Sequence, residues 1–145
     1  MVSNLSLDSL LDPVVEIARE AGQAVLEIYA GGNFQTTYKA DKSPLTQADL
    51  AANDIIIKRL HSLTPSIPII SEESLDIETS NRQTSAVIWL VDPLDGTKEF
   101  INKNGEFTVN IGLIQAGVPV LGVVYAPAHQ LLYYGARHIG AWKQI

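Results

Sequence analysis

The feature that most constrains this chain is an apolar run, residues 86–91, that stops at two carboxylates. The run is typical of a short buried strand. Asp92 and Asp95 follow it, with a proline between them and the pair Gly96-Thr97 behind them. A charge at the end of a buried strand costs on the order of several kcal/mol unless something matches it. A cation is the simplest match, so this stretch predicts a divalent metal site and phosphate chemistry.

The composition narrows the class of protein. The chain has 145 residues, of which 46% are hydrophobic and 18% charged, which is enough core material for about one globular domain. Its formal net charge is −6 and no basic patch is visible, so we expect no nucleic-acid partner. There is no cysteine, which excludes disulfides, thiolate metal sites and a cysteine nucleophile.

Membrane and export signals are also missing from the sequence. No apolar run approaches the roughly 18 residues that a membrane-spanning helix needs. The first residues, Met1 to Ser6, contain neither a basic segment nor an apolar core of a signal peptide. We therefore expect a cytoplasmic protein.

Helical signals occur in two places. A helix is expected from Asp8, as its cap, to about Ala30, before Gly31-Gly32. Thr46 and Asp49 have the spacing of a capping box and predict a second helix that runs to about residue 63. In this second helix we expect an inward face made of Leu50, Ile55, Ile57 and Leu60.

The pattern of the remaining sequence predicts mainly short strands. We expect them over 34–39, 67–70, 86–91, 107–114, 118–125, 130–135 and 139–143, with a short helix over 97–101. A tight turn at 115–117 would join two strands into a hairpin, and 75–85 reads as a loop. Two helices followed by an antiparallel meander indicate an α+β fold rather than a regular βαβ alternation.

Three segments of the expected fold begin or end in carboxylates. Asp49 starts the second helix, Glu72-Glu73 follow one strand, and Asp92 with Asp95 follow the next. Oxygen ligands without nearby histidine or cysteine suit Mg²⁺ or Mn²⁺ rather than zinc. Asp92 and Asp95 could face two ions about 4 Å apart, as in two-metal phosphatases. Glu72 and the backbone carbonyl of Leu94 could complete the first ion's ligands.

The residues that follow the two aspartates could bind the substrate phosphate and the attacking water. Gly96 and Thr97 open the short helix, whose N–H groups suit a phosphate, and glycine permits close approach. Thr97 could hold an attacking water while Asp49 accepts its proton. No side chain would then need to be phosphorylated.

Each of these signals has a structural alternative. Asp-Pro and Asp-Gly are ordinary turn pairs, Glu72-Glu73 could be solvated, and Asp49 could be only a cap. His61, His129 and His138 have no partners at ligand spacing. Haloacid-dehalogenase-type phosphatases use Asp-x-Asp-x-Thr with a nucleophilic aspartate, but here the second aspartate comes one position late. The coincidence of three acidic termini favours the metal site.

At these residues the chain resembles the magnesium-dependent, lithium-sensitive phosphatases of the inositol monophosphatase superfamily. Their shared pattern is an Asp, then Glu-Glu, then Asp-Pro-(Ile/Leu)-Asp-Gly-Thr, which this chain has at 49, 72–73 and 92–97. The closer resemblance is to the CysQ branch, the 3′(2′),5′-bisphosphate nucleotidases. It is carried by residues 39–46, 71–73, 90–101, 103–111 and 122–127.

The resemblance implies a fold and a role for each site residue. The fold would be the layered helix and antiparallel-sheet domain of the sugar phosphatases, in the α+β class. Glu72, Asp92, the Leu94 carbonyl and Asp95 would bind Mg²⁺, with Glu73 beside these ligands but not bound to the ion. The substrate phosphate would lie against Glu72, Leu94, Asp95, Gly96 and Thr97. Asp49 and Thr97 would activate water.

The resemblance also implies a reaction and a domain organisation. The substrate would be adenosine 3′,5′-bisphosphate, hydrolysed to AMP in sulfur assimilation, with Mn²⁺ as a possible substitute for Mg²⁺ and Li⁺ as an inhibitor. Bacterial members are cytosolic, sometimes at the inner face of the inner membrane. Residues 1–145 would form the N-terminal domain, without the second α/β domain and its Trp-Asp metal ligand. We expect this chain alone to be nearly inactive and to self-associate. The alternatives are an inositol monophosphate or fructose bisphosphate phosphatase, or a non-catalytic metal-binding module.

Overall fold

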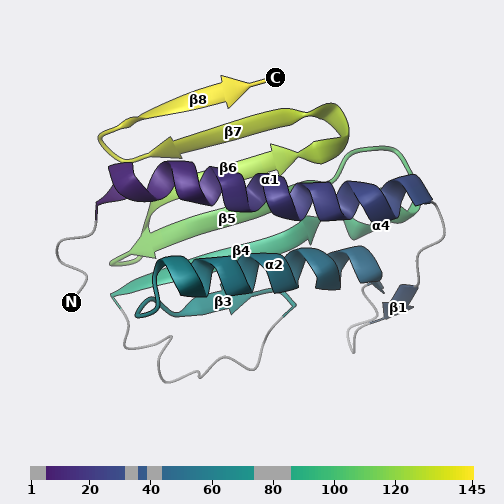
Figure 1. The fold of residues 1–145 in the computed structure, drawn as a ribbon, viewed down its shortest axis with the longest axis horizontal. Helices are drawn as coiled ribbons and strands as arrows, with labels where there is room; N and C mark the ends of the chain where they lie inside the picture. Colours follow the sequence, from purple (N-terminus) through teal and green to yellow (C-terminus); the bar gives the residue numbers. More distant parts are fainter. Residues whose placement is uncertain (1–5, 32–35, 39–43, 74–85) are drawn as a thin grey trace.

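The computed structural model of the chain describes residues 6–31, 36–38, 44–73 and 86–145. Two long helices, α1 (Leu7–Gly31) and α2 (Gln47–Leu63), lie against one sheet (Figure 1). The sheet contains β3 (Ile69–Ser71), β4 (Val87–Asp95), β5 (Thr108–Gln115), β6 (Val118–Ala126), β7 (Leu131–Ala136) and β8 (Gly140–Gln144), in that order. The smaller elements are β1 (Thr36–Tyr38), β2 (Pro44–Thr46), α4 (Thr97–Ile101) and the 3₁₀ turn η1 (Pro127–His129).

The sheet is antiparallel except at one edge. β3 pairs in parallel with β4, β4 pairs antiparallel with β5, and β5 to β8 form the expected antiparallel meander. The β5–β6 hairpin turns at Ala116 and Gly117, both with positive φ, as a two-residue turn of this kind requires. The α+β class is confirmed, with a mixed sheet.

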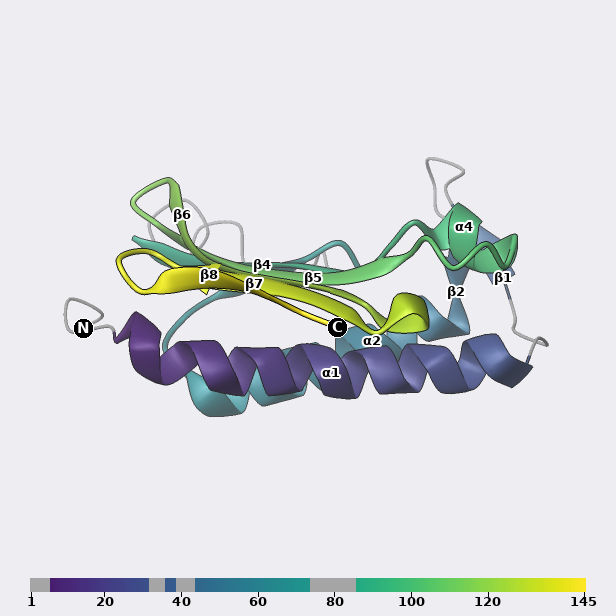
Figure 2. The same cartoon turned by 90° about the horizontal axis from the view of Figure 1, so that it is seen from above.

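Both long helices cover the same face of the sheet. Figure 2 shows α1 and α2 together on one side and, among the described elements, no long helix on the other. We call the uncovered side the open face. No helix of the described residues is long and apolar enough to cross a membrane.

Helix α1 begins two residues earlier than a cap at Asp8 would place it. Its first residue is Leu7, so Asp8 lies in the first turn, and the expectation that Asp8 caps the helix is wrong. The Ser6 hydroxyl instead accepts a bond from the backbone N–H of Ser9 at 3.4 Å. Further along, a Cβ on Gly22 would lie 2.4 Å from the Tyr125 ring. Glycine therefore lets α1 approach β6 closely.

Helix α2 starts with the predicted capping box of Thr46 and Asp49. The expected inward face was partly wrong, because Leu50 is 51% exposed. The helix buries Ala48, Asp49, Ala52, Ile56 and Leu60. These residues share a face because four positions make about one helical turn, whereas Leu50, two positions from Ala48 and Ala52, points elsewhere.

Large aromatic side chains fill the core between helices and sheet. Trp89 on β4 is fully buried, and its indole N–H donates to the Thr64 hydroxyl at 2.8 Å. Near the start of β5, the rings of Tyr29, Phe100 and Phe107 have centroids 4.8–5.4 Å apart. This aromatic cluster holds α4 and the end of α1 against the sheet.

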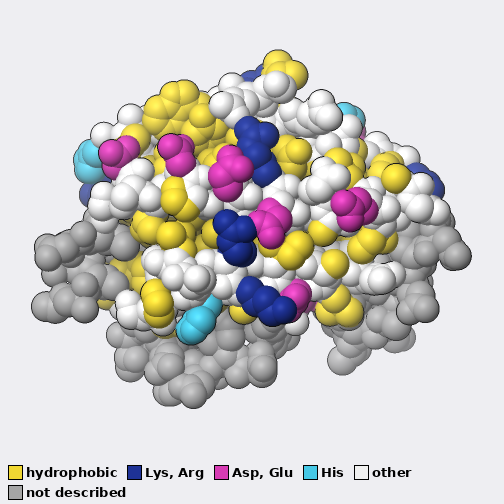
Figure 3. Space-filling model, viewed as in Figure 1, with side chains coloured by type: hydrophobic (Ala, Val, Ile, Leu, Met, Phe, Trp, Pro, Cys, Tyr) yellow, Lys and Arg dark blue, Asp and Glu magenta, His cyan; other side chains and the backbone are white. Residues whose placement is uncertain are grey.

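The helix side of the molecule carries charges of both signs. Figure 3 shows basic and acidic side chains interspersed over α1 and α2. Arg59 of α2 pairs with Glu20 of α1, and Lys58 pairs with Asp54 at 3.0 Å. These exposed pairs neutralise one another locally and add little stability.

Two expectations about the small elements need comment. The chain forms β2 at Pro44–Thr46, antiparallel to β1, where no strand was expected. The loop expected over 75–85 and the ends of the strand expected over 34–39 lie outside the described residues.

Candidate active site

Strand β4 runs through both carboxylates instead of stopping at residue 91, so the expected end of this strand was wrong. Asp92 pairs with Asn110, and the next pair is Asp95 with Thr108, which leaves one extra residue in β4. This irregularity is a β-bulge. Pro93 lies within it, where a missing N–H disturbs the ladder least. The acids are thus presented by a bulged strand rather than by a simple turn.

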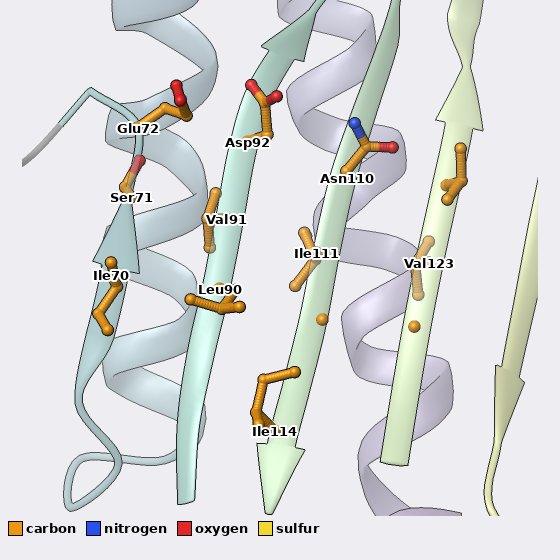
Figure 4. A pocket seen from close by; sticks show the side chains of 13 residues that line it. Ile70, Ser71, Glu72, Leu90, Val91, Asp92, Asn110, Ile111, Ile114 and Val123 are labelled. Atoms are coloured by element: carbon orange, nitrogen blue, oxygen red, sulfur yellow. The ribbon is translucent and has the colours of Figure 1, made fainter. Parts of the chain in front are cut away.

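The alternation of β4 separates its core face from its acidic face. Trp89 and Val91 are buried under the helices, whereas Leu90 and Asp92 lie on the open face. There, a hollow of about 480 Å³ is lined by residues of β3 to β6 and the turn after β3. Figure 4 shows Glu72, Asp92 and Asn110 at one end of this hollow and aliphatic side chains such as Ile114 toward the other.

The parallel pairing of β3 with β4 brings Glu72 beside Asp92. Ser71 is in register with Val91, and the backbone N–H of Glu72 donates to the Val91 carbonyl at 3.1 Å. Glu72, directly after the end of β3, therefore lies beside Asp92, which is within β4. The structure thus brings Glu72 and Asp92 together, and their binding of one ion stays a prediction.

Electrostatic crowding acts on Asp92. Burial, together with the charges of Asp95, Glu72 and Glu73, raises the pKa of its carboxyl from 3.8 to about 6, while a hydrogen bond from the Leu94 N–H acts in the opposite direction. Within the described part of the chain, no Lys or Arg forms an ion pair with Glu72, Asp92 or Asp95. The site therefore favours binding of a positive charge.

The acidic residues fit an open cation site better than a closed cage. Among the residues described, no three His, Cys, Asp or Glu side chains converge closely enough to hold an ion by themselves. Mg²⁺ is commonly bound by one or two carboxylates together with waters and substrate phosphates. Carboxylates at the rim of a hollow, with the carbonyl of Leu94 in the same bulge, match that requirement.

Asp49 uses its two carboxylate oxygens differently. The side chain is fully buried. Its Oδ2 accepts bonds from the Thr46 N–H at 2.9 Å and the Thr46 hydroxyl at 2.6 Å. Its Oδ1 accepts from the Thr97 hydroxyl at 3.0 Å. Asp49 therefore completes the capping box with Thr46 through one oxygen and is a partner of Thr97 through the other.

Gly96 shapes the turn between the acids and Thr97. Its φ is +92°, and an added Cβ would lie 2.8 Å from the Glu106 carbonyl oxygen. Only glycine accepts both the conformation and the close approach. The turn brings the Thr97 hydroxyl to 3.4 Å from the Leu94 carbonyl oxygen and starts α4 over the expected residues 97–101.

Two contributors at this site were not expected from the sequence. Asn110 pairs with Asp92 across β4 and β5 and lines the same hollow. Ser71 is 1% exposed and bonds to Asn53 of α2. The strand alternation of 107–114 could have placed Asn110 on the acidic face, but the Ser71–Asn53 contact depends on tertiary structure. The three histidines are exposed.

Comparison with known proteins identifies the family of this chain. The profile of the inositol monophosphatase family matches residues 6–144. The chain belongs to the inositol monophosphatase family. The resemblance drawn from the acidic motifs is thereby confirmed, together with the fold that it implied.

Members of this family include proteins very similar to this chain. The 3′(2′),5′-bisphosphate nucleotidase CysQ of Salmonella typhimurium is 51% identical over 136 residues, which cover 93% of this chain and 54% of that protein. The structure of CysQ from Bacteroides thetaiotaomicron is 42% identical, with a TM-score of 0.79 over 94% of this chain and 49% of that one. An inositol monophosphatase structure from Anabaena is 31% identical, with a TM-score of 0.77 over 94% and 47%. The chain spans about half the length of each of these relatives.

Proposed function

We propose that this chain carries the metal- and phosphate-binding part of a phosphomonoesterase, and that the complete enzyme is a 3′(2′),5′-bisphosphate nucleotidase. Its reaction would release the 3′-phosphate of adenosine 3′,5′-bisphosphate and leave AMP. The observation that carries the proposal is the Thr97–Asp49 hydrogen bond, one turn from the crowded carboxylates. The 51% identity with the Salmonella typhimurium nucleotidase supports the choice of substrate.

Glu72, Asp92, the Leu94 carbonyl and Asp95 would hold Mg²⁺ or Mn²⁺. When bound, such a cation would supply the positive charge that attracts the phosphate and makes water a better nucleophile. Glu73 would add negative charge next to this site without binding the ion. The Leu94–Thr97 turn would offer its backbone to the phosphate, and Glu72 would face the same group. By the family resemblance, Li⁺ would inhibit.

Thr97 and Asp49 would take the proton from the attacking water. Because the Thr97 hydroxyl donates its hydrogen to Asp49 Oδ1, its oxygen remains able to accept a hydrogen from water. As the water oxygen attacks phosphorus, its proton would pass to Thr97 and the Thr97 proton to Asp49. The bond from phosphorus to the nucleoside 3′-oxygen would break, and this oxygen would take a proton from solvent.

The rest of the enzyme is also part of the proposal. Since the chain covers about half of its relatives, we expect nucleotide recognition and efficient turnover to need polypeptide equivalent to their other half. This assigns residues 1–145 to an N-terminal domain. The proposed location is the cytoplasm or the inner face of the bacterial inner membrane.

A second substrate class has a specific observation behind it. The similar Anabaena structure is that of an inositol monophosphatase, so a sugar or inositol monophosphate is the alternative. A non-catalytic metal-binding fragment is the alternative from a different class.

An assay of phosphate release distinguishes the proposed nucleotidase from the two alternatives. The chain would be assayed alone and mixed with the remaining half of the Salmonella typhimurium nucleotidase, in Mg²⁺, on adenosine 3′,5′-bisphosphate, inositol 1-phosphate and fructose 1,6-bisphosphate. We expect turnover of the adenosine bisphosphate in the mixture and nearly none by the chain alone. Preference for inositol 1-phosphate would favour the sugar phosphatase. Metal binding without turnover in the mixture would favour the non-catalytic module.

A further inference from the structure

The acidic turn after β3 is fastened to helix α2 by a side-chain hydrogen bond that the proposed chemistry does not use. The Ser71 hydroxyl donates to Oδ1 of Asn53 at 2.5 Å. Asn53 lies four residues after Asp49, so both residues occupy the same side of α2. The bond therefore connects the helix that carries Asp49 to the strand end that carries Glu72.

The same hydroxyl also holds the turn itself. The Ser71 oxygen accepts a bond from the backbone N–H of Glu73 at 3.3 Å. On the other side, the backbone N–H of Glu72 donates to the Val91 carbonyl at 3.1 Å. Glu72 is thus flanked by one restraint from β4 and one from Ser71.

The position of β3 explains why such an anchor matters. β3 has three residues and lies at the edge of the six-stranded sheet, paired only with β4 among the described strands. A short edge strand has few backbone bonds, and strand ends open more easily than sheet centres. The Ser71 side chain, 1% exposed, adds a buried attachment where the strand ends.

We propose that Ser71 and Asn53 are a positioning pair that holds the Glu72 turn in place for cation binding beside Asp92. This inference rests on the proposed function, because it assigns Glu72 a ligand role. A ligand residue whose backbone is already held in place loses less freedom when it binds an ion, so the pair raises affinity without touching the ion. Removing such supporting partners typically weakens metal binding by about 10-fold to 100-fold.

The test is a Mn²⁺ titration followed by electron paramagnetic resonance on the 145-residue chain. Ser71→Ala and Asn53→Ala should each weaken Mn²⁺ binding by about 10-fold. The double variant should bind Mn²⁺ about as well as the weaker single variant, because Ser71→Ala and Asn53→Ala both remove the bond between these two side chains. Ser71→Thr, which keeps the hydroxyl, should restore most of the affinity.

Thr64→Val is the matched control. It removes the acceptor of the 2.8 Å bond from Trp89, which also joins the end of α2 to the sheet but away from the acidic turn. This variant should lower the free energy of unfolding while leaving Mn²⁺ affinity within about 2-fold of wild type, since the site is untouched.

Unchanged Mn²⁺ affinity in Ser71→Ala and Asn53→Ala, or a loss no larger than that of Thr64→Val, would overturn the inference. Additive losses in the double variant would also contradict it. If the wild-type chain bound no Mn²⁺, the proposed function would fail, and amide exchange would then test the anchor alone. Exchange of the Glu72 and Glu73 amides should be several-fold faster in Ser71→Ala, and unchanged exchange would remove the anchor as well.

Discussion

The Thr97 hydroxyl donates a hydrogen bond to Oδ1 of Asp49 at 3.0 Å, joining the start of α4 to the start of α2. These residues are 48 positions apart in the chain. Asp49 is held from the other side by two bonds from Thr46 to Oδ2. The carboxylate therefore has one fixed orientation, with one oxygen directed to Thr97.

Replacing Thr97 tests the proton relay. Thr97→Val keeps the shape of the side chain but cannot pass a proton to Asp49, so turnover should fall by about 100-fold or more. Thr97→Ser keeps the hydroxyl and should retain most activity. The measurement is phosphate release from adenosine 3′,5′-bisphosphate in the reconstituted mixture described above. Equal rates for Thr97→Val and wild type would exclude Thr97 from the relay.

Thr46 should matter to the stability of the chain. Thr46→Val removes the capping hydroxyl and one donor to a buried carboxylate, so the free energy of unfolding should fall by roughly 2 kcal/mol. Thr46→Ser keeps the donor and should stay close to wild type. Urea unfolding followed by circular dichroism measures both. A Thr46→Val chain as stable as wild type would mean that the backbone N–H of Thr46 alone satisfies Asp49 Oδ2.

The raised pKa of Asp92 should make the free energy of unfolding depend on pH when no divalent metal is present. Native Asp92 keeps its proton up to about pH 6, whereas the unfolded chain loses it near pH 3.8. The native state therefore binds more protons in this window, and the contribution of Asp92 to stability, complete below pH 3.8, is lost as the pH rises through 6. Asp92→Asn should be more stable than wild type at pH 7 and closer to it at pH 4. Urea unfolding at both pH values checks this, and a stability difference that is the same at pH 4 and pH 7 would contradict it.

Because the open face of the sheet exposes apolar side chains, we expect the isolated chain to self-associate. Leu90 on β4, Val124 on β6 and Tyr133 on β7 are 40–45% exposed there, and Val124 pairs with Tyr133. Exposed apolar groups on adjacent strands favour burial against another surface. Light scattering should show species larger than one chain, and Val124→Lys should reduce them. A monomer at all concentrations in the wild-type chain would contradict the prediction.

Short sequence motifs were sufficient to predict the positions of several elements. Thr46 and Asp49 determine the start of α2 because the capping box needs only residues three positions apart. Ala116 and Gly117 mark the β5–β6 turn for a similar reason. The bounds of α4 also follow from a short segment after Gly96.

Other features depend on strand pairing and could not be derived in the same way. β4 passes through Asp92, Pro93 and Asp95 because β5 lies beside it and tolerates one extra residue. The parallel pairing of β3 with β4, which places Glu72 beside Asp92, depends on tertiary structure and not on a local motif. Single residues without a motif, such as Asn110, become recognisable only when the register is known.

The candidate site was predicted in its residue types and only partly in its geometry. The pairing of Asp49 with Thr97 and the crowding of acids around Asp92 were expected from their places at element ends. The separate partners of the two Asp49 oxygens, Thr46 for Oδ2 and Thr97 for Oδ1, were not expected, because they depend on distances between α2, β2 and α4.

The most direct test of the central claim is isothermal titration of Mn²⁺ into the wild-type chain at pH 7.5, with and without inorganic phosphate, alongside Asp92→Asn. At this pH Asp92 is ionised, since its pKa is raised only to about 6. We expect saturable binding that phosphate strengthens and that Asp92→Asn abolishes. Absence of saturable binding by the wild-type chain, or equal binding by Asp92→Asn, would contradict it.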